Sequence, residues 1–199
     1  MKPRSLIVFA ILFATNSFAS YAAQNGEIHR VGTQINSSAA SYKNSQQDGD
    51  GVMSLYLYYN YNIDDTWALE LGVNGGAEIT DWDCKKINNR KFKCDRNNEL
   101  LFGIGADEVS FGNFVVAAKG QYQLTDNSHF YGKLGGQYYD YKIANNNIKM
   151  VQEYGLGLFA EAGWQYDWSN GLAFNAGLQY MDMGDLDTRS LSIGMSYRF

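Results

Sequence analysis

The sequence predicts an all-β protein, an eight-stranded antiparallel transmembrane β-barrel. Three observations lead to this prediction: the chain begins with an export signal, most of it alternates between apolar and polar residues, and its connections differ sharply in length. At 199 residues the chain is long enough for one domain. Its mean hydropathy of −0.36 is too low for a helical membrane protein. Only alternate residues of a membrane strand face lipid, so such an average does not reveal a barrel.

Residues 1–22 have the composition of a secretory signal peptide. Two basic residues precede an apolar run, and small residues follow it. The run is shorter than the ~20 residues that a membrane-spanning helix needs, which disfavours a membrane anchor. We predict cleavage after Ala19 or Ala22, so that residues 23–199 form the barrel domain. Removal of the two basic residues takes the formal net charge from −5 to −7.

The first three strands are predicted from a period-two alternation in residues 27–37, 53–63 and 67–74. Residues 27–37 form the weakest candidate, because their apolar face is thin. In residues 53–63 every second residue, starting at Met53, is apolar or aromatic. In residues 67–74 apolar residues alternate with a polar face that includes Glu70.

The other five strands show the same alternation and bring the total to eight. They are residues 113–122, 130–139, 155–166, 172–180 and 190–199. The last of them ends the chain, with apolar residues from Leu191 to Phe199 alternating with Ser, Gly and Arg. In a soluble sheet such an apolar terminal strand would be an exposed edge prone to aggregation. It is reasonable if the strand closes a barrel whose outer face meets lipid.

The connections indicate how the barrel is oriented. Three are short and four are longer and polar: 63–66, 124–128 and 168–171 against 38–50, 78–110, 143–150 and 182–189. Outer-membrane barrels have short periplasmic turns and long extracellular loops. Aromatic residues flank the short turns, as an interfacial girdle would. These are Tyr59, Tyr61, Trp67, Tyr122, Tyr166, Trp168, Tyr197 and Phe199.

The alternative is a soluble eight-stranded barrel that keeps its apolar face inside. Such a protein would expose the opposite face, which includes Glu70, Lys119, Gln121 and Asn175. The membrane barrel is favoured because that opposite face is rich in Gly, Ser, Asn and Gln, as a lumen requires. The clustering of aromatic residues at strand ends and the export signal favour it as well.

The chain also resembles a known family. The C-terminal residues Tyr197 and Phe199 resemble the signature by which Gram-negative barrel proteins are recognised for membrane insertion. Three parts of the chain are similar to the membrane domain of OmpA and to its small relatives of the OmpX/Ail group: WALELG (67–72), AKGQYQLTD with FYGKLGG (118–126 and 130–136), and LSIGMSYRF (191–199). The resemblance implies a Gram-negative outer-membrane location and assembly by the barrel-assembly machinery. These relatives share a barrel and differ in their loops.

The same resemblance implies a polar network inside the barrel. Glu70 and Lys119 stand where the family keeps an interior carboxylate and lysine, whereas Gln165 and Asn175 replace the other carboxylate and an arginine. An unpaired charge would be costly in so narrow a lumen. The network is therefore either a structural plug or the gate of a small pore. Its predicted members are Arg30, Glu70, Lys119, Lys133, Glu161, Gln165 and Arg198, and Glu153 is a further inward candidate.

The longest predicted loop carries two cysteines and a cluster of cations. In an exported chain, Cys84 and Cys94 most simply form one disulfide. The cations could bind a polyanion, either lipopolysaccharide phosphates or the glycans of another cell. The alternative is a solvated loop balanced by nearby aspartates. The cations are Lys85, Lys86, Arg90, Lys91, Lys93 and Arg96.

The inventory of reactive residues argues against an enzyme. The chain has two histidines, His29 and His129, and both fall at the short-turn side, away from any outer nucleophile. We predict no catalytic residue, metal or cofactor, and no nucleic-acid partner.

The predicted function is that of a monomeric outer-membrane barrel that acts through its extracellular loops, in surface interaction, adhesion or envelope integrity. Its expected partners are outer-membrane lipids, lipopolysaccharide, and host glycans or matrix proteins. A narrow passive pore is the first alternative, and a lipid-modifying outer-membrane enzyme is the second.

Overall fold

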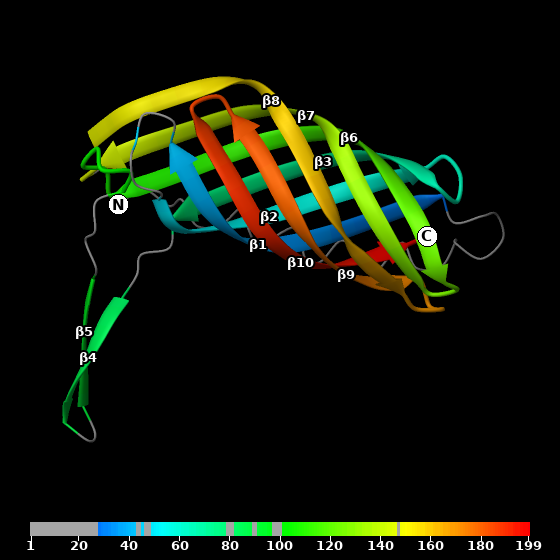
Figure 1. Cartoon of the computed structure of the whole chain (residues 1–199), viewed down its shortest axis with the longest axis horizontal. Coiled ribbons are helices and arrows are strands. Elements are labelled where there is room, and N and C mark those ends of the chain that lie inside the picture. The colour runs from blue at the N-terminus through cyan, green and yellow to red at the C-terminus, as the bar shows by residue number, and fades with distance from the viewer. Residues whose placement is uncertain are drawn as a thin grey trace, which may run out of the picture.

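The fold is an eight-stranded antiparallel β-barrel, described here from a computed structural model (Figure 1). The structure describes residues 28–42, 45, 49–78, 82–88, 91–96, 101–146 and 148–199. The barrel strands are β1 (His29–Tyr42), β2 (Gly49–Asn62), β3 (Trp67–Glu78), β6 (Glu108–Thr125), β7 (Ser128–Asn145), β8 (Ile148–Asp167), β9 (Leu172–Met183) and β10 (Leu186–Arg198). Their order around the ring is β1-β10-β9-β8-β7-β6-β3-β2. The predicted fold class and the eight strands are confirmed.

The first and last strands close the ring. β1 and β10 pair from Arg30 opposite Arg198 to Tyr42 opposite Leu186. Beyond that ladder, the His29 amide donates to the Phe199 carbonyl at 3.1 Å, and the Phe199 amide donates back to His29 at 2.8 Å. The C-terminal strand therefore has a partner on both sides and leaves no edge for aggregation.

The outer surface of the barrel is apolar, as the alternation predicts. Leu57, Val73 and Leu134 are exposed on this surface, whereas Gln34, Glu70 and Lys133 are buried in the lumen. This arrangement contradicts the soluble alternative, which required the apolar face inside. Other exposed members of the apolar belt are Ile35, Leu55, Leu69, Leu71, Phe114, Val116, Leu158, Leu178, Leu191, Ile193 and Met195.

The three short turns lie at the same end of the barrel as Phe199, which we call the short-turn end; the opposite end is the loop end (Figure 1). The short turns occur where they were predicted. The prediction of long loops at residues 143–150 and 182–189 is wrong. There β7 and β8 continue to a tight turn at Asn146 (φ 48°), and β9 and β10 continue to one at Gly184 (φ 75°).

The long strands explain these two errors. β7 has 18 residues and β8 has 20, whereas a membrane strand needs about 9–11. The strand ends were predicted where apolar alternation stops. Backbone pairing continues beyond the membrane, where outward side chains no longer have to be apolar. β1 extends in the same way to Tyr42, which shortens the first predicted loop.

The longest predicted loop contains structure of its own. β4 (Trp82–Asn88) and β5 (Lys91–Arg96) form a separate two-stranded hairpin that projects from the loop end in Figure 1. Leu101 and Ala106 then form an isolated bridge before β6 begins. Among the described residues no helix is long and apolar enough to cross a membrane. The predicted signal peptide lies outside the described residues.

Candidate functional site

The lumen is filled by two layers of side chains. The layer toward the short-turn end is polar and charged, and the layer toward the loop end is mainly apolar. Eight strands leave an interior that side chains can fill. The candidate site is therefore this closed lumen together with the loop end above it.

The centre of the polar layer is a lysine between two carboxylates. Lys133 Nζ lies 3.0 Å from Glu70 Oε2 and 3.1 Å from Glu161 Oε2. These three residues come from β7, β3 and β8, and each is at most 4% exposed. Tyr56 donates its hydroxyl to Glu70 at 2.7 Å, and Tyr131 donates to Glu161 at 2.6 Å. Each carboxylate therefore has both a cation and a neutral donor.

Aromatic rings and amides complete the surroundings of this cluster. Lys133 Nζ lies 4.6 Å from the centre of the Tyr58 ring, within range of a cation–π contact. Gln34 donates to Glu161 at 2.8 Å and to Asn175 at 2.9 Å. Buried charges and amides in this layer thus link five strands, β1, β3, β7, β8 and β9. A buried ion needs such partners because it is costly without them.

A second ionic group lies nearer the short-turn end. Arg30 forms an ion pair with Asp167, and it also donates to Ser196 Oγ at 2.9 Å. His129 Nε2 lies 2.9 Å from the other oxygen of Asp167. This carboxylate therefore joins β1, β7 and β8 at the base of the lumen.

Lys119 has a different environment from Lys133. Its Nζ donates to Gln165 Oε1 at 2.9 Å, and the Gln165 amide donates to Asp167 at 2.8 Å. Within the described residues, no carboxylate lies within 4 Å of Lys119. The ionic partner of Glu70 in the structure is Lys133, although Lys119 is the lysine that matches the family's interior position.

The structure places six of the seven predicted network residues in the lumen: Arg30, Glu70, Lys119, Lys133, Glu161 and Gln165. Arg198 is half-buried at the short-turn end, where its amide donates to Gly171. Glu153 lies apart from the network, toward the loop end, where it accepts from Tyr141 at 2.6 Å. Sequence reasoning missed Asp167, although it continues the inward alternation of Glu161 and Gln165 along β8.

The outer half of the lumen is an apolar core, which the sequence reading did not predict. Phe102, from the segment that precedes β6, is fully buried there. Its ring centre lies 5.8 Å from that of Tyr42. The core also includes Val52, Leu101, Ala106, Val109, Phe111, Ile143, Phe159, Met181, Met183 and Leu186. Most of these residues lie in strand extensions beyond the predicted strand ends, so their inward direction was not recognised.

The projecting hairpin carries the cations predicted to bind a polyanion. The register pairs Lys85 with Lys93. Two rungs away it pairs Asp83 with Asp95. Lys86, Lys91 and Arg96 also lie in this hairpin, and Arg90 falls outside the described residues.

The predicted disulfide is compatible with the hairpin register. Cys84 pairs directly with Cys94. Cα atoms of directly opposed residues in an antiparallel pair lie about 4.5–5.5 Å apart, within the range of about 4.4–6.8 Å that a disulfide needs. The bond itself remains a prediction.

Aromatic side chains surround the short-turn end. Tyr61, Trp67, Tyr122 and Trp168 are exposed there, where an interfacial girdle would lie. At the C-terminus the rings of Tyr197 and Phe199 stack with centres 6.4 Å apart. Their role as an insertion signal remains a prediction.

Comparison with known proteins gives one family match. The model of the outer membrane protein beta-barrel domain matches residues 7–199. A search of curated proteins finds no sequence match.

Solved structures share the fold at low sequence identity. Neisserial surface protein A is 14% identical, with a TM-score of 0.60, and the match covers 86% of this chain and 97% of that one. The attachment invasion locus protein Ail of Yersinia pestis, in complex with the heparin analogue sucrose octasulfate, is 14% identical, with a TM-score of 0.53 and the same coverage. OprG of Pseudomonas aeruginosa is 16% identical, with a TM-score of 0.53, and the match covers 86% of this chain and 95% of that one.

Proposed function

The chain belongs to the outer membrane protein β-barrel family, and from that membership we propose that it is a closed barrel acting through its extracellular end in surface interaction. The barrel crosses the outer membrane of a Gram-negative cell. In such proteins the short turns face the periplasm, so the loop end is extracellular. The observation that carries the proposal is the filled lumen, because it leaves the loop end as the part of the molecule open to partners.

The two layers of the lumen support a closed barrel rather than a pore. A conducting path must pass both the Lys133 cluster and the apolar core around Phe102. In the first layer, an ion would have to compete with charges that are already paired. In the second layer, it would cross a region lined mainly by Val, Ile, Phe, Met and Leu side chains, in which desolvation of the ion is costly.

The extracellular end supports a role in binding polyanions. The β4–β5 hairpin projects beyond the barrel and concentrates cations in a chain whose formal net charge is −5. A basic patch on an acidic protein attracts anionic partners. The related Ail has been solved in complex with a heparin analogue. We infer that sulfated glycans of another cell, or lipopolysaccharide phosphates, are the partners of this hairpin.

A non-enzymatic role fits the positions of the two histidines. His29 Nδ1 lies 2.7 Å from the Tyr59 hydroxyl, and His129 contacts Asp167. Both residues lie at the short-turn end, on the periplasmic side. A lipid-modifying enzyme that works on the outer leaflet would need its base at the other end of the barrel.

A binding titration tests the proposal. The refolded barrel should bind heparin, and affinity should fall steeply with salt, because the Debye length shrinks from ~10 Å at 0.1 M to ~3 Å at 1 M. Neutralising Lys85, Lys86, Arg90, Lys91 and Lys93 together to glutamine should abolish binding. The matched control is Lys142→Gln with Lys149→Gln, which removes cations from β7 and β8.

Heat-modifiable migration in SDS should be unchanged in every variant, which shows that the barrel has folded. Absence of binding at low salt would refute the assignment of polyanions to the hairpin, as would binding that survives loss of the five cations. The surface function would then have to reside in the other extracellular connections.

A further inference from the structure

The first and last barrel strands, β1 and β10, meet at a joint that no loop or turn spans. Every other pair of neighbouring strands in the ring is consecutive among the barrel strands, so a covalent connection holds one of its ends. At the β1–β10 joint, only noncovalent contacts keep the two strands together. Chain segments near the ends of a domain open most readily unless contacts tie them down. The joint therefore depends on its side-chain contacts as well as on its backbone ladder.

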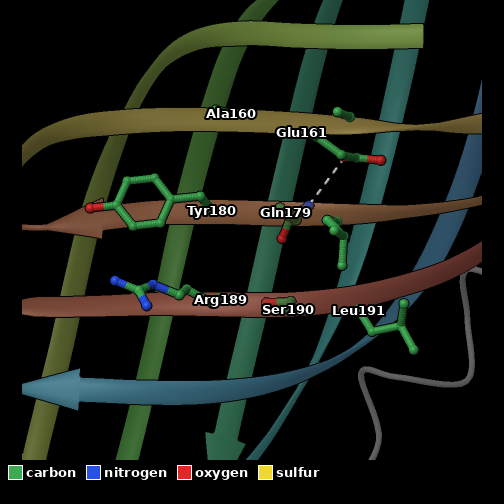
Figure 2. Close-up of a pocket in the computed structure, with 9 residues that line it drawn as sticks. Ala160, Glu161, Gln179, Tyr180, Arg189, Ser190 and Leu191 are labelled. Carbon is green, nitrogen blue, oxygen red and sulfur yellow. Dashed lines mark hydrogen bonds between the residues drawn. The ribbon is translucent and has the colours of Figure 1, made fainter. Parts of the chain in front are cut away.

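Along most of the joint, the contacts on the inner face differ from those on the outer face. On the inner face, side chains form hydrogen bonds across it: Ser38 Oγ lies 2.6 Å from Ser190 Oγ. Figure 2 shows Ser190 on β10, beside β9. On the outer face, opposed residues are mostly small or apolar, such as Ile35 opposite Ile193. Such residues gain little from each other, because lipid tails are equally apolar neighbours.

His29 is different from the rest of the outer face. It is the only outward residue of β1 that has a ring, and it lies at the short-turn end. Its ring centre lies 5.7 Å from that of Phe199 on β10, and 5.9 Å and 5.8 Å from those of Tyr59 and Tyr61 on β2. Phe199 also stacks on Tyr197. Rings at such separations attract each other beyond the effect of their buried area.

A polar contact orients the His29 ring. Its Nδ1 atom lies 2.7 Å from the Tyr59 hydroxyl, which can donate to the unprotonated nitrogen of a neutral imidazole. The backbone of His29 holds Phe199 as well, through one hydrogen bond in each direction. We propose that His29 is a positioning residue for the C-terminus: its ring holds Phe199 beside β2 and keeps the short-turn end of the joint closed.

The closed joint protects the end of the chain. An open end of β10 would present unpaired amide and carbonyl groups, which are a template for pairing with other chains. It would also give a carboxypeptidase access to Phe199. The His29 contact therefore limits both aggregation through this edge and degradation from the C-terminus.

Digestion of the folded barrel with carboxypeptidase A tests this role. The enzyme removes C-terminal aromatic residues and stops at arginine, so it should release Phe199 and leave Arg198 in place. The rate follows the population of the open end when opening and closing are fast. His29→Ala should release Phe199 roughly tenfold faster than the wild type, because ring contacts and one hydrogen bond are lost. Mass spectrometry of the intact chain measures the release.

Three further variants separate the His29 contact from a general loss of stability. His29→Phe keeps a ring and should restore most of the protection. Tyr59→Phe should accelerate release in the wild type but not in His29→Phe, because both changes break the same hydrogen bond. Tyr122→Ala removes an exposed ring of the same girdle from β6, away from the joint, and should behave like the wild type.

Heat-modifiable migration in SDS shows that each variant is folded, and the unfolded chain should lose Phe199 readily. The role of His29 is refuted if folded His29→Ala releases Phe199 within about twofold of the wild-type rate, including the case in which neither releases it. It is also refuted if His29→Phe is as fast as His29→Ala, or if Tyr122→Ala is. Should His29→Ala fail to fold, equal release by Tyr59→Phe and the wild type refutes it.

Discussion

At the scale of single residues, Lys133 organises the lumen. It is the cation between Glu70 and Glu161, whereas Lys119 contacts an amide. Removing one partner of a buried ion pair leaves the other charged and desolvated, which costs more than the pair contributes. The two lysines are therefore unequal, although both are buried and both point into the barrel.

This inequality gives a prediction. Lys133→Met should destabilise the folded barrel by about 3–5 kcal/mol, because it leaves two carboxylates without their cation. Lys119→Met should cost less, since it breaks a hydrogen bond with Gln165 and leaves the ion pairs in place. Urea unfolding in lipid vesicles, followed by heat-modifiable migration, measures both. A larger loss for Lys119→Met would contradict the assignment of Lys133 as the central cation.

At the scale of elements, the segment that precedes β6 is part of the barrel core. Phe102 is fully buried and has a positive φ of 56°, a conformation uncommon for a bulky residue. Contacts with the apolar core, including the ring of Tyr42, hold it in place. The segment therefore acts as an internal plug at the extracellular end rather than as a surface loop.

Truncating the plug should be costly. Phe102→Ala should destabilise the barrel by about 3–5 kcal/mol, the usual range for loss of a buried aromatic ring. It should also increase the frequency of small channel openings in a planar bilayer. Leu124→Ala is a suitable control, because Leu124 is exposed near the short-turn end. Unchanged stability of Phe102→Ala would show that the ring does not contribute to the core.

The elements also show where prediction from sequence succeeds and fails. Alternation locates all eight barrel strands, because a lipid-facing surface forces every second residue to be apolar. It fails for the strand extensions, such as the outer parts of β7 and β8, because outside the membrane that constraint ends. The apolar half of the lumen was missed for the same reason, since residues such as Met183 and Leu186 lie in those extensions.

Within the candidate site, the sequence predicts which side chains point into the lumen better than it predicts which of them contact each other. The period-two pattern places Glu70, Lys119 and Lys133 inside, but it does not say which of them meet across the lumen. That depends on the register and on the stagger of strands distant in sequence. The pairing of Lys133 with Glu70, and of Arg30 with Asp167, therefore needed the structure.

At the scale of the whole molecule, we propose that the barrel is a closed membrane anchor for its extracellular end. Its wall is apolar where it meets lipid, its strands extend beyond the membrane, and the β4–β5 hairpin projects from the loop end. Polar and apolar layers close the lumen in series. The interactions of the protein should then take place on its outer surface rather than through its interior.

Single-channel recording in planar bilayers tests this central claim most directly. The unmodified barrel should show no conductance, or only small and rare openings, because both layers of the lumen would have to rearrange together. Its folded state is checked in the same preparation by migration in SDS before and after boiling. Large and steady conductance from the folded, unmodified protein would contradict the closed lumen and would instead favour the narrow pore.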